Sequence, residues 1–204
     1  MRSALPLALI AALAACSSSS GGNGSVNGTV DGVSFSAASG IAEVGPESSS
    51  TDCNVSPDGG QTCTSSSSGQ VVAVALTNRA GISCETITGG GTKFANMDLL
   101  ELGVGTASGT VATGTYDIVG SESNLTSGAE AILLTTTANC GQGLNLTASS
   151  GTITLSQITA TSVSGSYSVT FGSMGTFSGS FDEPICEVPD GGSMMSSGDG
   201  GVCQ

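Results

Sequence analysis

Alternation of apolar and polar positions with a period of two recurs along the chain, and few stretches have the period of a helix. The clearest case is "GTVDGVSFSA" at 28–37, in which Asp31-Gly32 is a strong two-residue hairpin turn. This turn predicts three opposed pairs on one face of a sheet: Val30 with Val33, Gly28 with Phe35, and Val26 with Ala37. The residues expected on the other face are Thr29, Ser34 and Ser36.

A second hairpin is predicted over 163–181, "VSGSYSVTFGSMGTFSGSF". Val163, Gly165, Tyr167, Val169 and Phe171 alternate with hydroxyl side chains, and so do Phe177, Gly179 and Phe181 after the glycines. Directly opposed residues share a face. We therefore expect a loop over 172–176, the aromatic rings on the core face, and three opposed pairs: Phe171 with Phe177, Val169 with Gly179, and Tyr167 with Phe181.

Further strands are predicted at 70–77, 115–119, 130–138 and 151–159. The segment "VVAVAL" within the first of these is apolar on both faces, which is typical of a central strand. Residues 93–102 fit either a strand with a bulge or a short helix. Many short strands separated by turn residues predict an all-β fold: a single antiparallel β-sandwich or barrel-like domain with long Gly/Ser/Thr loops, of which 45–69 is one.

The start of the chain differs from this pattern. Met1-Arg2 precedes an apolar run at 4–15, which is shorter than the about 20 residues that cross ~30 Å of hydrocarbon as a helix. A basic start, a short apolar core and small residues are typical of a secretory signal. An ordinary cleaved signal followed by an incidental cysteine is one interpretation.

The residues Leu13-Ala14-Ala15-Cys16 resemble the lipobox of bacterial lipoproteins. The resemblance implies cleavage before Cys16, a diacylglyceryl thioether on its sulfur and an acylated new amino terminus. Two or three acyl chains anchor a protein stably. Residues 17–25 are rich in Ser and Gly, so we expect a flexible tether with a reach of about 15–18 Å.

Serine rather than aspartate follows the lipobox cysteine, at Ser17. In lipoproteins of enteric bacteria, aspartate at this position retains the protein in the inner membrane. The resemblance therefore favours the outer membrane, with the protein in the periplasm or facing the surface.

The chain contains seven cysteines, an odd number. Assigning Cys16 to lipid leaves six, and exported compartments are oxidising, so three disulfides are expected to staple the domain. The disulfide candidates are Cys53, Cys63, Cys84, Cys140, Cys186 and Cys203. Six cysteines allow 15 connectivities.

Two local pairs are favoured because a Pro-Asp-Gly-Gly turn lies between their members: Cys53 with Cys63, and Cys186 with Cys203. Cys84 would then pair with Cys140, and the rival is Cys140 with Cys186. Metal binding by the cysteines is disfavoured, because the chain contains no Cys-x-x-Cys spacing and no histidine.

The composition is acidic but poor in charge, with a net charge of −13 and 9% charged residues, against ~25% in ordinary domains. Cleavage would remove Arg2 and leave Arg79 and Lys93 as the cations. A basic footprint for nucleic acid is therefore absent. The polar surface must consist largely of Ser, Thr and Gly.

The block "GTITL…VSGSYSVTFG…GTFSGSFDEPIC" resembles uncharacterised lipoproteins of myxobacteria and their relatives. The resemblance covers about 40 residues, together with the lipobox and the "VDGV" start. It implies a β-rich fold and a location in the cell envelope, and it brings no known activity or catalytic residues.

Catalytic motifs are scarce. Without histidine, Ser-His-Asp and Cys-His arrangements cannot form, and the Ser-x-x-Lys spacing that a dyad with Lys93 would use is missing. Carboxylate pairs that could hydrolyse glycosides are Asp98 with Glu101 and Asp182 with Glu183. The second pair should point to opposite faces of its strand, because the two residues are adjacent.

Calcium is the one metal for which candidates exist: Asp58, Asp190 and Asp199 lie in Gly-rich segments, as does Asp52. Turn formation explains these Asp-Gly pairs without metal. We therefore expect no cofactor beyond the covalent lipid.

Together these patterns divide the chain into a signal peptide (1–15), a lipidated cysteine with its tether (16–25), a β-sandwich (26–188) and a low-complexity acidic tail (189–204). The expected function is that of a non-catalytic, lipid-anchored envelope module for binding or scaffolding, whose partners are the membrane and an unidentified envelope component. The alternatives are a small-ligand or calcium-binding lipoprotein and a carboxylate-based hydrolase.

Overall fold

The computed structural model describes residues 24–46, 51–55, 61–65, 69–84, 92–119, 127–186 and 202–203, with the backbone alone at 51–55, 61–65, 92–93 and 202. The strands of the described residues are β1 (Asn27–Val30), β2 (Ser39–Pro46), β3 (Thr51–Val55), β4 (Gln61–Ser65), β5 (Gln70–Thr77), β6 (Thr92–Lys93), β7 (Asp98–Thr106), β8 (Gly114–Asp117), β9 (Ser127–Thr136), β10 (Gln142–Thr147), β11 (Ser150–Ile158), β12 (Ser162–Thr170), β13 (Gly175–Pro184) and β14 (Val202–Cys203).

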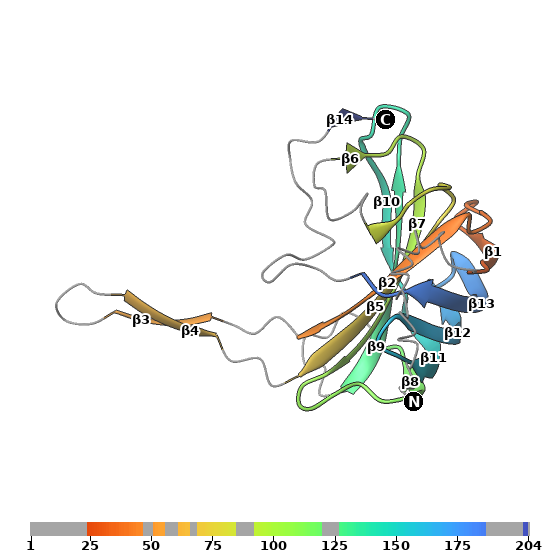
Figure 1. Ribbon diagram of the computed structural model, residues 1–204. Coiled ribbons are helices and arrows are strands. Elements are labelled where there is room, and N and C mark those ends of the chain that lie inside the picture. The colour runs from red at the N-terminus through yellow and green to blue at the C-terminus, as the bar shows by residue number, and fades with distance from the viewer. Residues whose placement is uncertain are drawn as a thin grey trace, which may run out of the picture.

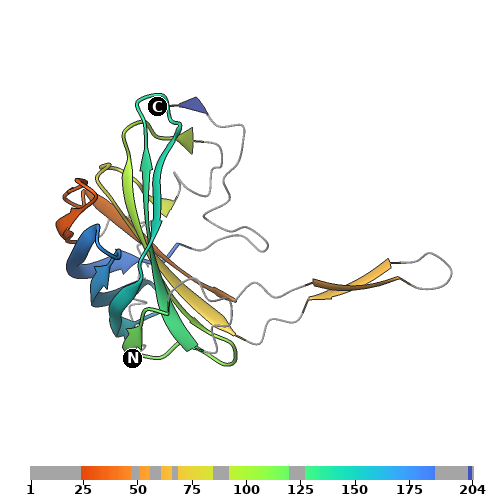
Figure 2. The same ribbon diagram turned by 180° about the vertical axis from the view of Figure 1, so that it is seen from behind.

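Two five-stranded antiparallel sheets form the body of the protein. The first sheet has the order β1-β13-β12-β11-β8, and the second has the order β10-β9-β7-β5-β2. The sheets stack face to face (Figure 1; Figure 2 shows the view from behind). The predicted all-β sandwich stapled by disulfides is confirmed.

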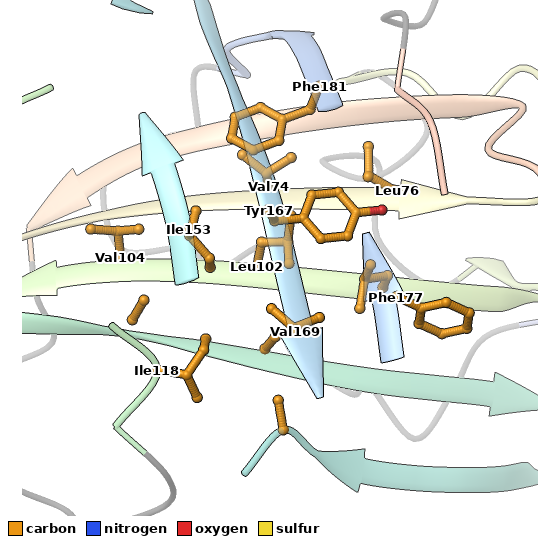
Figure 3. Close-up of a cluster of buried hydrophobic side chains, with 14 of the residues drawn as sticks. Val74, Leu76, Leu102, Val104, Ile118, Ile153, Tyr167, Val169, Phe177 and Phe181 are labelled. Carbon is orange, nitrogen blue, oxygen red and sulfur yellow. The ribbon is translucent and has the colours of Figure 1, made fainter. Parts of the chain in front are cut away.

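The core lies between the two sheets and is built from the inward positions of both (Figure 3). The second sheet contributes aliphatic side chains from β5, β7 and β9, whereas the first contributes most of the aromatic rings. The residues of this core with at most 2% exposure include Val72, Leu76, Leu100, Leu102, Leu133, Ile153, Val169, Phe171, Phe177 and Phe181. Strand β5 lies between β2 and β7, so the prediction of a central strand is confirmed.

The Asp31-Gly32 turn forms as predicted, with positive φ at both residues and mutual backbone hydrogen bonds between Val30 and Val33. The faces are also right, since Phe35 packs on the core. The extended pairing is wrong, because β1 pairs with β13 instead and Gly28 lies opposite Phe177. After Val33 the chain must cross to the second sheet to begin β2, so it cannot stay alongside β1.

The hairpin β12–β13 forms with its aromatic rings on the core face, but its predicted register is wrong by two residues. Tyr167 lies opposite Gly179, and Val169 lies opposite Phe177. The Phe171 amide donates to the Gly175 carbonyl, so the loop is shorter than expected. The observed register places an aromatic ring opposite a glycine rather than opposite a second ring, which relieves crowding on the core face.

Most of the other strand predictions are confirmed: β5, β8, β9 and β11 cover the expected segments to within three residues at each end. The prediction of a long loop over 45–69 is wrong, because this segment contains the hairpin β3–β4. The hairpin extends away from the sandwich in Figure 1. Its Thr and Val residues favour strands, a preference that the abundance of serine concealed.

The ambiguous segment 93–102 forms no helix. It consists of the end of β6, a turn in which Asn96 has positive φ, and the start of β7. Asn78 holds this turn, because its side-chain amide donates to an Asp98 carboxylate oxygen at 2.9 Å and its side-chain carbonyl accepts the Asp98 amide at 3.0 Å.

The described disulfides join Cys84 to Cys186 and Cys140 to Cys203. The expected pairs Cys186–Cys203 and Cys84–Cys140 are therefore wrong, and so is the rival Cys140–Cys186. The backbone explains the first bond. The Cys186 amide donates to the Ala42 carbonyl, which places Cys186 against β2 and the segment that follows β5.

The third expected pair, Cys53 with Cys63, lies where the structure describes the backbone alone. The two residues are directly opposed in the register of β3 and β4. That register supports the predicted disulfide, which stays a prediction.

Among the side chains that the structure describes, one charged group is fully buried. Glu183 on β13 occupies an inward position and is completely buried. Its carboxyl group lies beside Leu76 on β5 and over Gly40 on β2, where a Cβ atom would overlap it. Gly40 therefore provides the space that the carboxyl group occupies.

We expect Gly40→Ala to lower the free energy of unfolding by about 1–3 kcal/mol, because the new methyl group must displace a buried side chain. Chemical denaturation followed by circular dichroism measures this change. The matched control is Gly45→Ala on the same strand, whose Cβ would have its nearest neighbour at 3.7 Å, and it should cost less than about 0.5 kcal/mol. Equal losses in both variants would contradict the packing described.

Candidate functional site

Ser25, the last residue of the predicted tether, is fastened to the first sheet. Its amide donates to the Ser180 carbonyl at 2.8 Å, and its hydroxyl accepts the Ser180 amide at 3.0 Å. The buried Tyr167 hydroxyl donates to the Ser25 carbonyl at 2.8 Å. Burial raises the pKa of Tyr167, so this hydroxyl keeps its proton. The chain thus enters the fold at a point bonded directly to a core side chain.

The outer side of the first sheet carries hydroxyl side chains on four neighbouring strands, and we name it the hydroxyl face. Pairs of hydroxyls hydrogen-bond across the strands, as between Thr115 and Thr154 and between Thr170 and Thr176, both at 2.9 Å. This face provides many donors and acceptors, and Asp117 and Asp182 add exposed carboxylates to it. Its hydroxyl residues are Thr115, Thr154, Ser164, Ser166, Ser168, Thr170, Thr176, Ser178 and Ser180.

The outer side of the second sheet has a different chemistry. Ala73 and Gly103 lie between Glu43 and Glu130 in one row across the strands, and Glu101 projects two residues further along β7. These three carboxylates define the acidic patch. Its surroundings are small or apolar: Ala75 and Gly105 are buried, and Val71, Leu99, Ile132 and Leu134 are partly exposed.

Burial is the main cause that raises the pKa of Glu101, and the charges of Glu130 and Glu43 add to it. A raised pKa means that the folded state holds this proton more tightly than the unfolded chain does. As the pH rises from the usual value of 4.5, the unfolded chain releases its proton first. Stability attributable to Glu101 therefore falls with rising pH, and the loss is complete above the folded-state pKa.

The variant Glu101→Gln should accordingly be more stable than the wild type at pH 7. The difference should shrink towards zero below pH 4.5, where the carboxyl group is neutral in both states. Thermal unfolding followed across this pH range measures the effect. A gain that does not depend on pH would contradict the electrostatic cause.

Glu130→Gln tests the contribution of the neighbouring charge, since it should move the transition caused by Glu101 to lower pH. Asp182→Asn is the matched control, because Asp182 is exposed on the other sheet. Its stability should change by less than about 0.5 kcal/mol.

The predicted carboxylate pairs do not converge. Asp182 is exposed and Glu183 is buried, so the expected opposite faces are confirmed. Asp98 and Glu101 are three residues apart on β7 and point to opposite sides, and Asp98 is bonded to Asn78. Burial raises the pKa of Asp98.

The structure does not describe the side chains of the remaining predicted site residues. Cys16, Asp58, Asp190 and Asp199 fall outside the described residues, while Asp52 and Lys93 fall where only the backbone is described. Among the side chains that are described, no three of the types His, Cys, Asp and Glu gather as metal ligands.

Sequence reasoning missed the interior location of Glu183 and the gathering of Glu43, Glu130 and Glu101. A signal for Glu183 existed, because it continues the alternation that places Phe177 and Phe181 in the core. The acidic patch had no local signal, since its members come from three strands far apart along the chain.

The described part of the chain has no helix of sufficient length and apolar character to span a membrane. Comparison with family models, curated proteins and solved structures found no match to this chain.

Proposed function

We propose that the chain is a lipid-anchored, non-catalytic β-sandwich module of the bacterial cell envelope, attached through Cys16 to the outer membrane. The sequence motif Leu13-Ala14-Ala15-Cys16 is the observation that carries this proposal. The cysteine sulfur supplies the nucleophile to which a diacylglyceryl group attaches, and the small residues before it give a peptidase access to the backbone.

The junction at Ser25 supports the proposal from the structural side. The Ser/Gly segment that follows Cys16 is short, and it ends where Ser180 and Tyr167 hold the chain. An anchor at Cys16 would therefore hold the sandwich close to the lipid surface, on a tether with a root-mean-square length of about 15–18 Å, while leaving it free to tilt.

Binding or scaffolding fits the two outer faces better than catalysis does. The hydroxyl face offers many hydrogen-bond donors and acceptors, and the chain contains no histidine that could act with the carboxylates of the acidic patch in acid–base chemistry. The whole module would act by presenting these faces and the hairpin β3–β4 at the envelope.

Membrane fractionation tests the anchor. The wild-type chain, expressed in a bacterium that processes lipoproteins, should pellet with the outer membrane and resist extraction by high salt and alkaline carbonate. Cys16→Ser should leave the chain unacylated and abolish this salt- and carbonate-resistant attachment. Ser18→Ala, a change in the tether that leaves the sulfur in place, is the matched control and should fractionate like the wild type.

Two outcomes would overturn the proposal. One is a wild-type chain that is exported into the soluble fraction, and the other is carbonate-resistant attachment of Cys16→Ser equal to that of the wild type. Recovery of the wild type in the inner membrane would remove the outer-membrane assignment alone.

A further inference from the structure

The two described disulfides differ in their surroundings. Cys186 is 2% exposed and packs with Ile41 and Ala75 beneath the segment that contains Cys84. Cys203, in contrast, is exposed, and its partner Cys140 is partly exposed. Thiol–disulfide exchange requires a thiolate to reach one sulfur along the axis of the bond, so exposure decides which disulfide can react in the folded protein.

The turn that carries Cys140 is closed by hydrogen bonds of its own, since the Thr137 amide donates to the Gly141 carbonyl at 2.9 Å and the Gly141 amide donates to the Thr137 hydroxyl at 3.1 Å. Cys140 lies in a tight turn, where its amide donates to the Thr137 carbonyl at 2.9 Å and its φ is +55°. Left-handed backbone is unfavourable for a residue other than glycine, and it persists where the surroundings enforce it. Breaking the disulfide removes one of the constraints that enforce it here.

Cys203 has a more limited attachment. Its strand β14 pairs with β6 over two residues only, Val202 with Thr92 and Cys203 with Lys93. Strand β14 belongs to neither of the two five-stranded sheets. Opening the disulfide therefore releases residues 202–203 without breaking either sheet.

We propose that the Cys140–Cys203 disulfide is a thiol-exchange site, at which a thiolate of a small thiol or of a dithiol oxidoreductase attacks Cys203 while the sandwich stays folded. A bond forms between the incoming sulfur and Cys203 Sγ, and the bond between Cys203 and Cys140 breaks. Cys140 leaves as the thiolate and takes up a proton from water.

With a dithiol, the second thiolate of the reagent then attacks its own sulfur in the mixed disulfide. The reagent is oxidised to its disulfide, and Cys203 leaves reduced. Two electrons have moved from the reagent to the protein, and the disulfide no longer links residues 202–203 to the turn between β9 and β10. The site thus couples the attachment of β14 to the thiol redox state around the protein.

The test uses the folded full-length mature chain in buffer without denaturant. Dithiothreitol is added in increasing concentration, free thiols are trapped with N-ethylmaleimide, and the labelled cysteines are located by peptide mass spectrometry. Cys140 and Cys203 should be labelled at least about tenfold faster than Cys84 and Cys186, because attack on the buried bond first requires opening of the fold. The far-ultraviolet circular dichroism should stay unchanged during the fast phase.

A second arm uses reduced glutathione, a monothiol that leaves a mixed disulfide on the attacked sulfur. Glutathione should appear on Cys203 in preference to Cys140. The variant Cys140→Ser/Cys203→Ser is the control. It should fold, lack the fast phase and keep the slow labelling of Cys84 and Cys186.

Simultaneous labelling of both described disulfides, Cys84–Cys186 and Cys140–Cys203, would overturn the proposal, and so would faster labelling of Cys84 and Cys186. Loss of the circular dichroism signal together with reduction of Cys140–Cys203 would also overturn it, because the bond would then be required by the fold. None of these outcomes depends on the lipid at Cys16, so the anchor and the exchange site are tested separately.

Discussion

The double variant Cys84→Ala/Cys186→Ala is expected to lose about 3–5 kcal/mol of unfolding free energy. The two cysteines are separated by 102 residues, and closing a loop of about 100 residues lowers the entropy of the unfolded chain by the equivalent of about 4.7 kcal/mol. The bond also covers Ile41 and Ala75 on the outer side of the second sheet, so its loss exposes apolar surface. Guanidinium denaturation under oxidising conditions measures the change.

The matched control is Cys140→Ala/Cys203→Ala, which removes the other described disulfide. We expect this variant to lose less than half as much unfolding free energy. Strand β14 is paired over two residues only, so the Cys140–Cys203 bond also restricts this end of the chain in the folded state. Because the bond lowers the entropy of both states, it stabilises the fold less. An equal loss in both variants, or an unchanged denaturation midpoint for Cys84→Ala/Cys186→Ala, would contradict the roles assigned to the two bonds.

Truncation of the central aromatic side chain should have a comparable effect. Phe177 has no exposed surface, and its ring packs edge-on against Phe171 at 6.2 Å and against Phe35 at 5.9 Å between ring centroids. Phe177→Ala should therefore lower the unfolding free energy by about 3–5 kcal/mol, through lost burial and through the cavity left behind. Thermal and chemical unfolding both measure the loss.

Phe177→Leu keeps much of the apolar volume and should lose clearly less than Phe177→Ala. Met174→Ala changes an exposed side chain in the turn of the same hairpin and should cost less than about 0.5 kcal/mol. A small effect of Phe177→Ala, comparable with that of Met174→Ala, would show that Phe177 is not at the centre of the core.

The sequence was informative about faces and less so about registers. Alternation assigns Tyr167 and Phe177 to the core correctly, because a strand turns every second side chain to the same side. A register shifted by two residues preserves those faces. The pattern therefore cannot separate Tyr167 opposite Phe181 from Tyr167 opposite Gly179, and the turn at Gly172 and Gly175 decides it.

The disulfide pairing could not be obtained from local signals. A turn between Cys186 and Cys203 made that pair attractive, but Cys186 is fixed by β13 and the edge of β2, and Cys203 lies beside β6. Both positions follow from the order of the strands in the sheets. That order depends on contacts between distant segments, which the spacing of cysteines does not encode.

Of the candidate site, the sequence predicted the directions of individual side chains but not which carboxylates lie near one another. The divergence of Asp182 and Glu183 follows from alternation alone. The acidic patch needs the neighbour relations of β2, β7 and β9, so Glu43 and Glu130 could not be linked to Glu101 from the sequence.

The most direct test of the proposed anchor is the intact mass of the chain extracted from native membranes, measured before and after reduction. We predict a mature chain that begins at Cys16, carries the mass of its acyl groups and gains two hydrogen atoms for each disulfide reduced. A mature chain without acyl mass, in which the Cys16 thiol reacts freely with an alkylating reagent, would contradict the prediction.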